Sequence, residues 1–532
     1  MKTLRTACAT CALILMPPLY GNYHTSHTFF SVRQQFRDVM PEKLSLFQDR
    51  MLARSEGILG AMQIVPFFSK STNTAELARF FMPYGKTQIS AGEFGSQAVA
   101  DGSVDVMANY FGVLSRPPSD VFTDTGLDAQ DLTFQSTVQF KPVQTVFGIG
   151  LGYHQQITGH LTKGTFIHLA APIMRVNNDM GLSETIINKG GGTLGPEVAP
   201  GWAANMTEAL SGHTIFGTKK FNYGKISPCG LTKWGLADIE VWFGYENREC
   251  STCKRNWWAG VYIPTGNRPT GEYLFEPIIG NNKHFGVMFG GTYKHLIWTN
   301  SDDKELWMNF NSQTRYLFTN KQRRSMDLID KQWGRYLWLF SNKNNTHIPE
   351  NLQPGINYLT LDVHVSPRSA LNLNNAMVYT CRGFRAEAGL NSYARQSELV
   401  ALECPFKEEM GIAGMFQSRD FATTAQPTKS NATISRYLYQ QGILNDVALT
   451  NNNDPCETGA TAQFIPITEG DLDPTSAAQP ATISFAMYAT LGYAWDDIAI
   501  PTFISLGGSY EFSADNAGLE RWMAWGKIGM SF

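Results

Sequence analysis

The chain has 532 residues, of which 43% are hydrophobic and only 17% charged, and its formal net charge is -3 at pH 7. The charged fraction lies below the roughly 25% of soluble domains, and the near-neutral charge argues against nucleic acid as a partner. Aromatic residues reach 12% and glycine occupies 48 positions, a composition that favours β-structure over helix.

The first residues have the form of a secretory signal peptide. Lys2 and Arg5 make a short basic region, residues 6–20 are mainly apolar or small, and Gly21 is small enough to precede a cleavage site. This apolar run is too short to span roughly 30 Å of hydrocarbon, and no later segment offers about 18 apolar residues without charges. We therefore expect residues 1–21 to be a cleaved signal peptide and the protein to be exported.

Residues 22–56 form a polar segment with one helical pattern. Met40, Leu44, Phe47 and Met51 recur at helical spacing, and Pro41 suits the first turn of a helix. We expect a short amphipathic helix here. The segment is either a plug or periplasmic arm of a barrel, or an ordinary leader that packs on the barrel rim.

Three stretches of period-two alternation lie at residues 481–495, 502–512 and 521–532. Each places apolar side chains on one face and small or polar ones on the other. In the last stretch Ile528 is on the apolar face and Lys527 on the polar face, and in the stretch before it Leu506 is on the apolar face. Because the connections between them are short, we expect antiparallel neighbouring strands.

The same alternation recurs upstream, at residues 132–141, 147–154, 239–245, 285–294, 306–318, 359–365 and 384–395. Many runs exceed the five or six residues of an average soluble strand and reach the length of about 9–11 that a tilted membrane strand needs. A soluble β-sandwich also alternates. Strand length and aromatic strand ends favour an all-β fold, an antiparallel transmembrane β-barrel over residues 57–532 with about 16 strands, in a range of about 12–18.

Long loops are expected at residues 176–233, 265–283 and 397–481. Counting strands back from the last one places 397–481 outside the cell but the other two loops in the periplasm. Long loops of such barrels normally lie outside, so this strand set contains a conflict, which one unrecognised strand near residues 432–439 would remove.

The final strand resembles the C-terminal insertion signal of Gram-negative outer-membrane β-barrel proteins. The resemblance is carried by apolar residues at alternate positions before a terminal phenylalanine, namely Trp522, Ile528, Met530 and Phe532. It implies a place in the cell outer membrane, contact with membrane lipid, and recognition by the barrel-assembly machinery, with a homo-oligomer as a further possibility. Residues 260–266 look similar to a strand end in porin-like and hydrocarbon-transport barrels.

Strand parity also predicts which charged residues face the lumen. If the apolar face meets lipid, the inward candidates are Lys141, Asp238, Glu240, Lys294, Glu305, Arg315, Asp362, His364, Arg385, Glu387, Arg395, Glu511, Arg521 and Lys527. A lining of both signs suits a water-filled channel with weak ion preference. The alternative is a closed lumen bridged by ion pairs among these residues.

Six cysteines follow the signal peptide, at Cys229, Cys250, Cys253, Cys381, Cys404 and Cys456. An even number in an exported chain permits disulfides, although the sequence does not choose a pairing. The pair Cys250 and Cys253 has no further ligands at zinc spacing, so we expect a disulfide that ties a loop. No metal or other cofactor is expected.

These features predict a porin-like channel for passive diffusion of small polar solutes. The alternative is a structural or adhesive surface protein with a closed barrel, which the long loops and disulfides would serve. No motif links a histidine to a serine or aspartate nucleophile, so we do not expect an enzyme.

Overall fold

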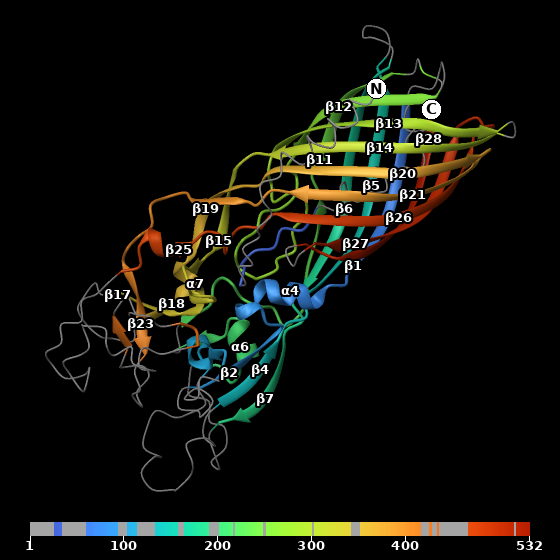
Figure 1. Ribbon diagram of the computed structural model, residues 1–532. Coiled ribbons are helices and arrows are strands. Elements are labelled where there is room, and N and C mark those ends of the chain that lie inside the picture. The colour runs from blue at the N-terminus through green and yellow to red at the C-terminus, as the bar shows by residue number, and fades with distance from the viewer. Residues whose placement is uncertain are drawn as a thin grey trace, which may run out of the picture.

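The computed structural model describes residues 26–33, 60–93, 104–113, 134–157, 164–190, 202–215, 219–247, 250, 252–300, 303–341, 352–415, 425–427, 433–435, 466–514 and 518–532. These residues form a β-barrel and, at one of its ends, a second body built from the connections between barrel strands (Figure 1). We call this second body the cap. The predicted signal peptide, the predicted helix at 40–51 and Cys456 lie outside the described residues.

The barrel is a closed ring of twelve antiparallel strands. In order around the ring these are β6 (Thr165–Asp179), β11 (Ile239–Asn247), β12 (Cys253–Ile263), β13 (Gly286–Asn300), β14 (Lys304–Leu317), β20 (Arg368–Cys381), β21 (Phe384–Arg395), β26 (Thr482–Trp495), β27 (Thr502–Ser513), β28 (Arg521–Ser531), β1 (Gly60–Ser71) and β5 (Val143–Gln156). Pairing of β5 with β6 closes the ring. The first estimate of about 16 strands is therefore wrong, and twelve is the lower end of the expected range.

An extra strand, β10 (Leu231–Leu236), pairs with residues 173–178 of β6. The preceding part of β6, residues 165–170, pairs with β11. Leu236 lies opposite Ile173, whereas Glu240 lies opposite Ala170, so the register shifts by one residue between them. β10 and β11 are thus one strand interrupted by a β-bulge at Ala237 and Asp238.

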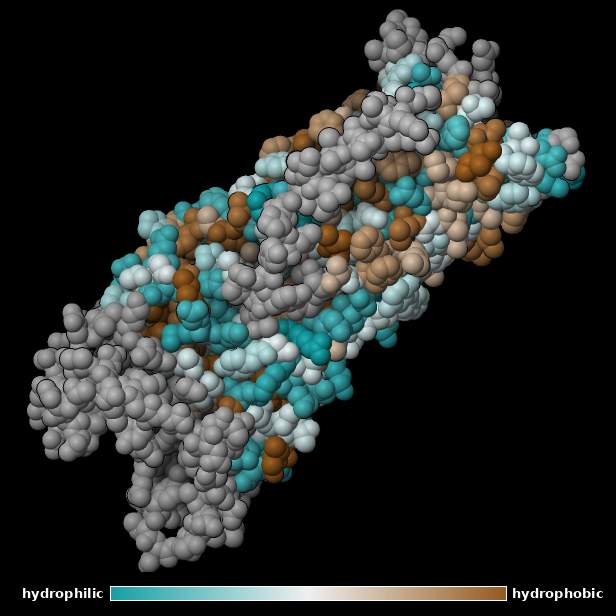
Figure 2. All heavy atoms as spheres, in the orientation of Figure 1, coloured by the Kyte–Doolittle hydropathy of each residue, from teal (hydrophilic) through white to brown (hydrophobic). Residues whose placement is uncertain are grey.

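The polarity of the barrel is inverted relative to a soluble protein. Leu151, Ile64, Ile528 and Ile504 are neighbours across four adjacent strands and are all exposed on the outer surface. The inner face is polar and buried at many positions, including Gln63, Asn256, Asn309, Asn311, Gln313, Asn372, Asn374, Ser505 and Lys527. In Figure 2, brown and tan residues form patches over the barrel, while teal residues are frequent on the part of the cap that is not grey. An apolar exterior of this kind is typical of a barrel in lipid.

The last barrel strand shows the same inversion. Ile528 is exposed on the outer face and Lys527 is buried on the inner face, as the alternation predicts. The residues of the predicted insertion signal are all exposed on the outside, namely Trp522, Ile528, Met530 and Phe532. Their role in assembly stays a prediction.

Glycines let large rings pack against the inner wall. Gly290 on β13 lies beneath the Trp258 ring of β12, and a Cβ atom there would be 2.2 Å from the ring. Gly507 makes the same room for Trp525. Part of the glycine content therefore serves ring packing inside the barrel.

All long connections leave the barrel at one end. Short turns, at 157–164, 248–252, 301–303, 382–383 and 496–501, lie at the other end, where Gly60 hydrogen-bonds Phe532. This arrangement removes the topological conflict; of the range 432–439, where an extra strand was predicted, only residues 433–435 belong to the described part of the chain. The runs at 132–141 and 359–365 are not barrel strands, and four barrel strands escaped the alternation search, at 60–71, 165–179, 253–263 and 368–381.

Within the described ranges, the cap has three short helices and several small sheets. The helices are α4 (Thr74–Phe81), α6 (Met206–Leu210) and α7 (Gly355–Tyr358), with 3-10 turns η1 (Pro83–Gly85), η2 (Ala108–Phe111), η5 (Gly334–Tyr336) and η8 (Glu469–Asp471). One sheet contains β2 (Gln88–Gly92), β3 (Val106–Met107), β4 (Phe134–Gln139) and β7 (Ser183–Lys189), and another β15 (Asn320–Ser325), β19 (Thr360–Ser366) and β22 (Leu399–Leu402). The remaining sheets pair β17 (Trp338–Ser341) with β18 (Leu352–Pro354) and β23 (Met410–Met415), β23 with β24 (Ala425–Pro427), β16 (Asp327–Leu328) with β25 (Leu472–Asp473), and β8 (Thr214–Ile215) with β9 (Lys219–Lys220).

A hydrophobic core of its own holds the cap together. Trp333, Trp338, Tyr110 and Tyr336 are fully buried in it. α4 contributes the apolar side of its helix, with Phe80 and its neighbours buried while Glu76 and Arg79 stay in solvent. The cap is thus folded like a small soluble domain, with apolar residues inside. No helix in the described ranges is long and apolar enough to cross a membrane.

His284 lies where the 264–285 connection meets the cap, and it is fully buried. Its Nδ1 lies 2.7 Å from the carbonyl oxygen of Phe318, and its Nε2 lies 2.8 Å from the Gln322 amide nitrogen. A neutral ring that donates from Nδ1 and accepts at Nε2 satisfies both contacts. Burial lowers the pKa of His284 to about 4.

The outward position of Leu506, which is 69% exposed, predicts a specific pattern of stability. Leu506→Ala should be mild because lipid fills the gap, whereas Leu506→Arg should cost about 2–4 kcal/mol near the bilayer midplane. As a matched control, Leu337→Ala in the cap core should cost about 2–5 kcal/mol through its cavity. Urea unfolding in phospholipid vesicles gives the free energy of unfolding of all three variants and of the wild type. An alanine effect at 506 as severe as the arginine effect would mean that this face is a packed core.

His284 predicts a loss of stability in acid. In the unfolded chain its pKa is near 6.5, and in the fold it is about 4, so between these values only the unfolded chain takes up the proton. Stability should be full above pH 6.5 and fall as the pH drops toward 4, by up to about 3 kcal/mol from this residue. Unfolding by urea across this pH range should show a shallower dependence for His284→Asn. Identical dependence in both proteins would refute the assignment.

Candidate functional site

The inner wall of the barrel holds most of the predicted lumen residues. Ten lie on the inward face of barrel strands, at Glu240, Lys294, Glu305, Arg315, Arg385, Glu387, Arg395, Glu511, Arg521 and Lys527. The wall therefore carries both signs of charge. Whether these residues line a conducting pore stays a prediction.

Four other candidates lie elsewhere. Lys141 is an exposed residue between β4 and β5, and Asp362 and His364 lie on β19 in the cap. Asp362 pairs with Arg323 at 2.9 Å, and this hydrogen-bonded guanidinium holds the pKa of the carboxyl below its ordinary value. These three assignments were wrong because a cap strand with one solvated face alternates like a barrel strand.

Asp238, the fourth, lies in the β-bulge and is fully buried. Its carboxylate accepts hydrogen bonds from the backbone and side-chain nitrogens of Asn281, at 2.8 and 2.7 Å. It also accepts one from the backbone of Gly266. Asp238 thus fixes the 264–285 connection to the wall instead of facing an open lumen.

Residues 26–33 join the cap to the lumen, and we call them the strap. Its first half belongs to the cap. Ser26 donates to Asp327 at 2.8 Å, and Arg335, which pairs with Asp327 at 2.7 Å, donates to the carbonyl oxygen of Ser26. The His27 ring stacks on Phe80 with centroids 4.4 Å apart. All these groups are buried, so the strap is firmly anchored in the cap.

The second half of the strap crosses the lumen at the cap end. Ser31 and Val32 border two cavities of about 30 Å³ each. One cavity is lined by β5 and β6, including Val146 and Met174, and the other by β14 and β21, including Arg315. A cavity of this size holds about one water molecule. The strap therefore fills the space between these walls at the mouth next to the cap, which we call the cap mouth.

Arg33 attaches the end of the strap to the barrel wall. Its Nη1 atom donates to Glu511 on β27 at 2.6 Å and to Ser484 on β26 at 3.1 Å. Its Nη2 atom donates to the Asn391 oxygen on β21 at 2.5 Å. Its guanidinium carbon lies 4.3 Å from the centre of the Tyr393 ring. Three strands thus supply a carboxylate, a hydroxyl, an amide oxygen and a ring face to one side chain.

Three further arginines lie around the strap, at Arg315, Arg395 and Arg521. Arg395 donates to the Ser31 carbonyl oxygen, and Arg315 donates to the Tyr393 hydroxyl, both at 2.8 Å. Arg521 pairs with the second oxygen of Glu511 at 2.8 Å and donates to the carbonyl oxygen of Arg33. The cap mouth is therefore rich in positive charge, with Glu511 held between two arginines.

A row of rings lines another part of the inner wall. His154, His168, Trp242 and Trp258 come from β5, β6, β11 and β12, and successive ring centroids lie 6.0, 4.5 and 4.3 Å apart. The predicted lumen residues did not include this row, whose members are all aromatic rings. The same alternation, applied to His154, places that residue on the inner face.

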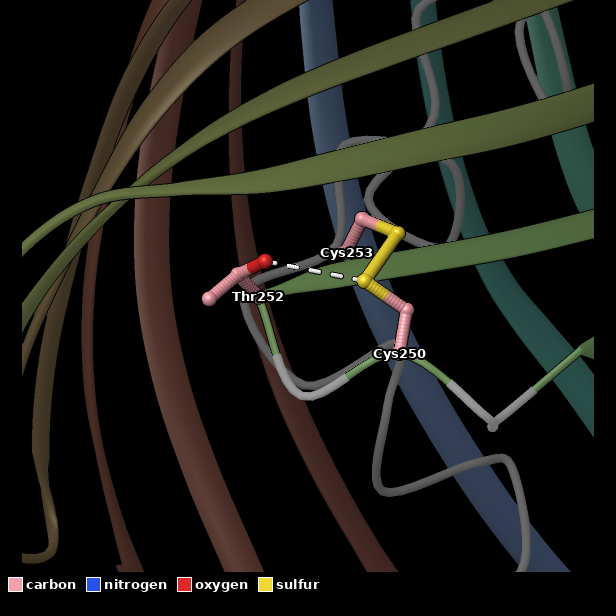
Figure 3. Close-up of a disulfide and its surroundings, with 3 residues drawn as sticks. All are labelled: Cys250, Thr252 and Cys253. Carbon is pink, nitrogen blue, oxygen red and sulfur yellow. Dashed lines mark hydrogen bonds between the residues drawn. A yellow bond between two sulfur atoms is a disulfide. The ribbon is translucent and has the colours of Figure 1, made fainter.

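Cys250, in the short connection between β11 and β12, forms a disulfide with Cys253, the first residue of β12 (Figure 3). Thr252 lies beside the pair, with its hydroxyl oxygen 3.6 Å from the Cys250 sulfur. Cys229, Cys381 and Cys404 form no disulfide among the described residues, and the remaining candidate, Cys456, lies outside them.

No protein-family profile matches the sequence, nor does any curated protein. Among solved structures the chain is similar to an outer membrane channel from Pseudomonas putida F1, with a TM-score of 0.37, 8% identity, and coverage of 91% of this chain and 98% of that one. It is also similar to the transport unit of the autotransporter AIDA-I from Escherichia coli, with a TM-score of 0.30, 9% identity, and coverage of 94% and 100%. A FadL homologue from Pseudomonas aeruginosa has a TM-score of 0.25 and 6% identity, with coverage of 90% of each chain.

Similarity at this level does not assign the chain to a family. The expected resemblance to outer-membrane β-barrel proteins is nevertheless confirmed for the architecture, because the chain itself forms a closed antiparallel barrel with an apolar exterior.

Proposed function

We propose that this protein is an outer-membrane channel for small solutes whose cap mouth is closed by the strap. One observation supports it above all: the barrel turns apolar residues such as Leu506 outward and charged residues such as Glu387 and Lys527 inward. In water, apolar side chains on the outer surface would not stabilise the fold, because they would remain exposed to solvent. In lipid, it shields a polar lumen that water and solutes can occupy.

Small polar solutes fit this lumen best. Both signs of charge occur along the wall, with Glu240 and Glu387 among the acids and Arg315 and Lys527 among the bases. Neutral amides, including Asn309, Gln313 and Asn374, lie between them. Such a wall offers hydrogen bonds to many solutes and a strong preference for none.

The cap faces the cell exterior in this proposal, and the short turns face the periplasm. Long connections of outer-membrane barrels lie outside, and short turns lie inside. The apolar outer surface of the barrel then contacts membrane lipid. The exposed residues of β28, from Trp522 to Met530, are available to the assembly machinery.

A closed-barrel surface protein is the second candidate, and a specific observation favours it. The strap crosses the lumen and is held at both ends by buried ion pairs, Asp327–Arg335 with Ser26 in the cap and Glu511–Arg33 in the barrel. A barrel that never opens would present the cap as its working surface.

Conductance in planar lipid bilayers separates the two candidates. Arg33→Ala removes the contact between the strap and the wall, so it should give more frequent and larger current steps than the wild type. Arg79→Ala, an exposed arginine on α4, is the matched control and should behave like the wild type. Silence of both the wild type and Arg33→Ala, with folding verified by heat-modifiable migration in gels, would overturn the channel and leave the closed barrel.

A further inference from the structure

The contacts of Arg33 have the form of a ligand site. Four groups from the barrel surround one planar cation: the Glu511 carboxylate, the Asn391 amide oxygen, the Ser484 hydroxyl and the Tyr393 ring. Arg33 is 6% exposed and Glu511 2% exposed, so the groups are shielded from water. Charge-assisted hydrogen bonds are strongest in such surroundings.

The geometry selects a guanidinium over an ammonium ion. The two terminal nitrogens of Arg33 donate to different strands, Nη1 to β26 and β27 and Nη2 to β21. The flat face of the same group lies over the Tyr393 ring. An ammonium ion is a compact charge and cannot reach these acceptors and stack on the ring at once.

The site is held in place without the strap. Arg521 on β28 binds the second oxygen of Glu511 at 2.8 Å, which leaves the first oxygen directed at Arg33. Asn391 also donates to Asn372 on β20 at 2.7 Å, which orients its oxygen toward the guanidinium. Ser484 donates to Glu511 at 2.7 Å. Because the barrel positions each acceptor, loss of Arg33 leaves a preformed pocket.

We propose that Glu511, Asn391, Ser484 and Tyr393 form a binding site for guanidinium cations, which Arg33 of the same chain occupies in this structure. A small solute bearing a guanidinium group then competes with the strap at the cap mouth. The inference deepens the proposed channel function by naming a class of solute that the mouth recognises. Arg521, Arg315 and Arg395 nearby oppose a second cation, so the affinity for a free ligand is modest.

The test measures methylguanidinium binding to the Arg33→Ala protein in detergent micelles by calorimetry. We expect binding with a dissociation constant of order 1 mM and no binding of methylammonium at equal concentration. The wild type and Arg79→Ala, whose sites remain filled, should bind at least about tenfold more weakly. Adding Asn391→Ala to Arg33→Ala removes one charge-assisted hydrogen bond and should weaken binding at least about tenfold.

Equal binding of both cations, or no binding of methylguanidinium to folded Arg33→Ala protein, would overturn the site. If Arg33→Ala does not fold alone, the same two cations are added during refolding. Recovery of folded barrel with methylguanidinium but not methylammonium supports the site, and recovery with neither or with both equally overturns it. The binding test measures no current, so it is independent of the channel proposal. If the protein binds methylguanidinium but does not conduct, the channel proposal fails and the site stands. If it conducts but does not bind methylguanidinium, only the site proposal fails.

Discussion

Ring closure is the constraint on which the rest of this structure depends. A backbone group without a partner in hydrocarbon costs several kcal/mol, and the twelve barrel strands meet this requirement through hydrogen bonds to neighbours on both sides, with β5 and β6 completing the circle. Closure fixes an inside and an outside for every strand. Each side chain then faces either lipid or lumen according to its parity, which explains why Leu506 and Ser505 can be adjacent in sequence and so different in exposure.

A ring of twelve strands is narrow enough for its own side chains and one strap to fill at the mouth. The strap can fill the mouth because its two halves pack in different environments, the first in an apolar core and the second against a polar wall. Phe29 and Phe30 are buried in the manner of a soluble core, next to the cap, while Arg33 satisfies polar groups of the lumen wall. The strap therefore contacts the cap core through its first half and the lumen wall through its second half.

The sequence predicts the barrel best where one face meets lipid over a whole strand. On β26, β27 and β28 the alternation gave the correct faces, down to Ile528 and Lys527. It failed at β4 and β19, because a cap strand with one buried face shows the same period, and it missed β1, where Val65 and Phe67 are apolar although they are buried on the inner face. For the site, parity found Glu511 and Arg521. Arg33 could not be found, because its partner Glu511 lies 478 positions away and no local pattern encodes such a contact.

Accessibility of single spin labels along β27, in protein reconstituted into liposomes, tests the inverted barrel most directly. Labels at Phe503, Ile504, Ser505, Leu506, Ser509 and Tyr510 should show a period of two. Collision with lipid-soluble oxygen should be high at 504, 506 and 510, whose native side chains are exposed on the outer face, and low at 503 and 505, which are buried within the barrel. Low oxygen accessibility at both parities, as in a packed protein core, or the opposite parity would contradict the account.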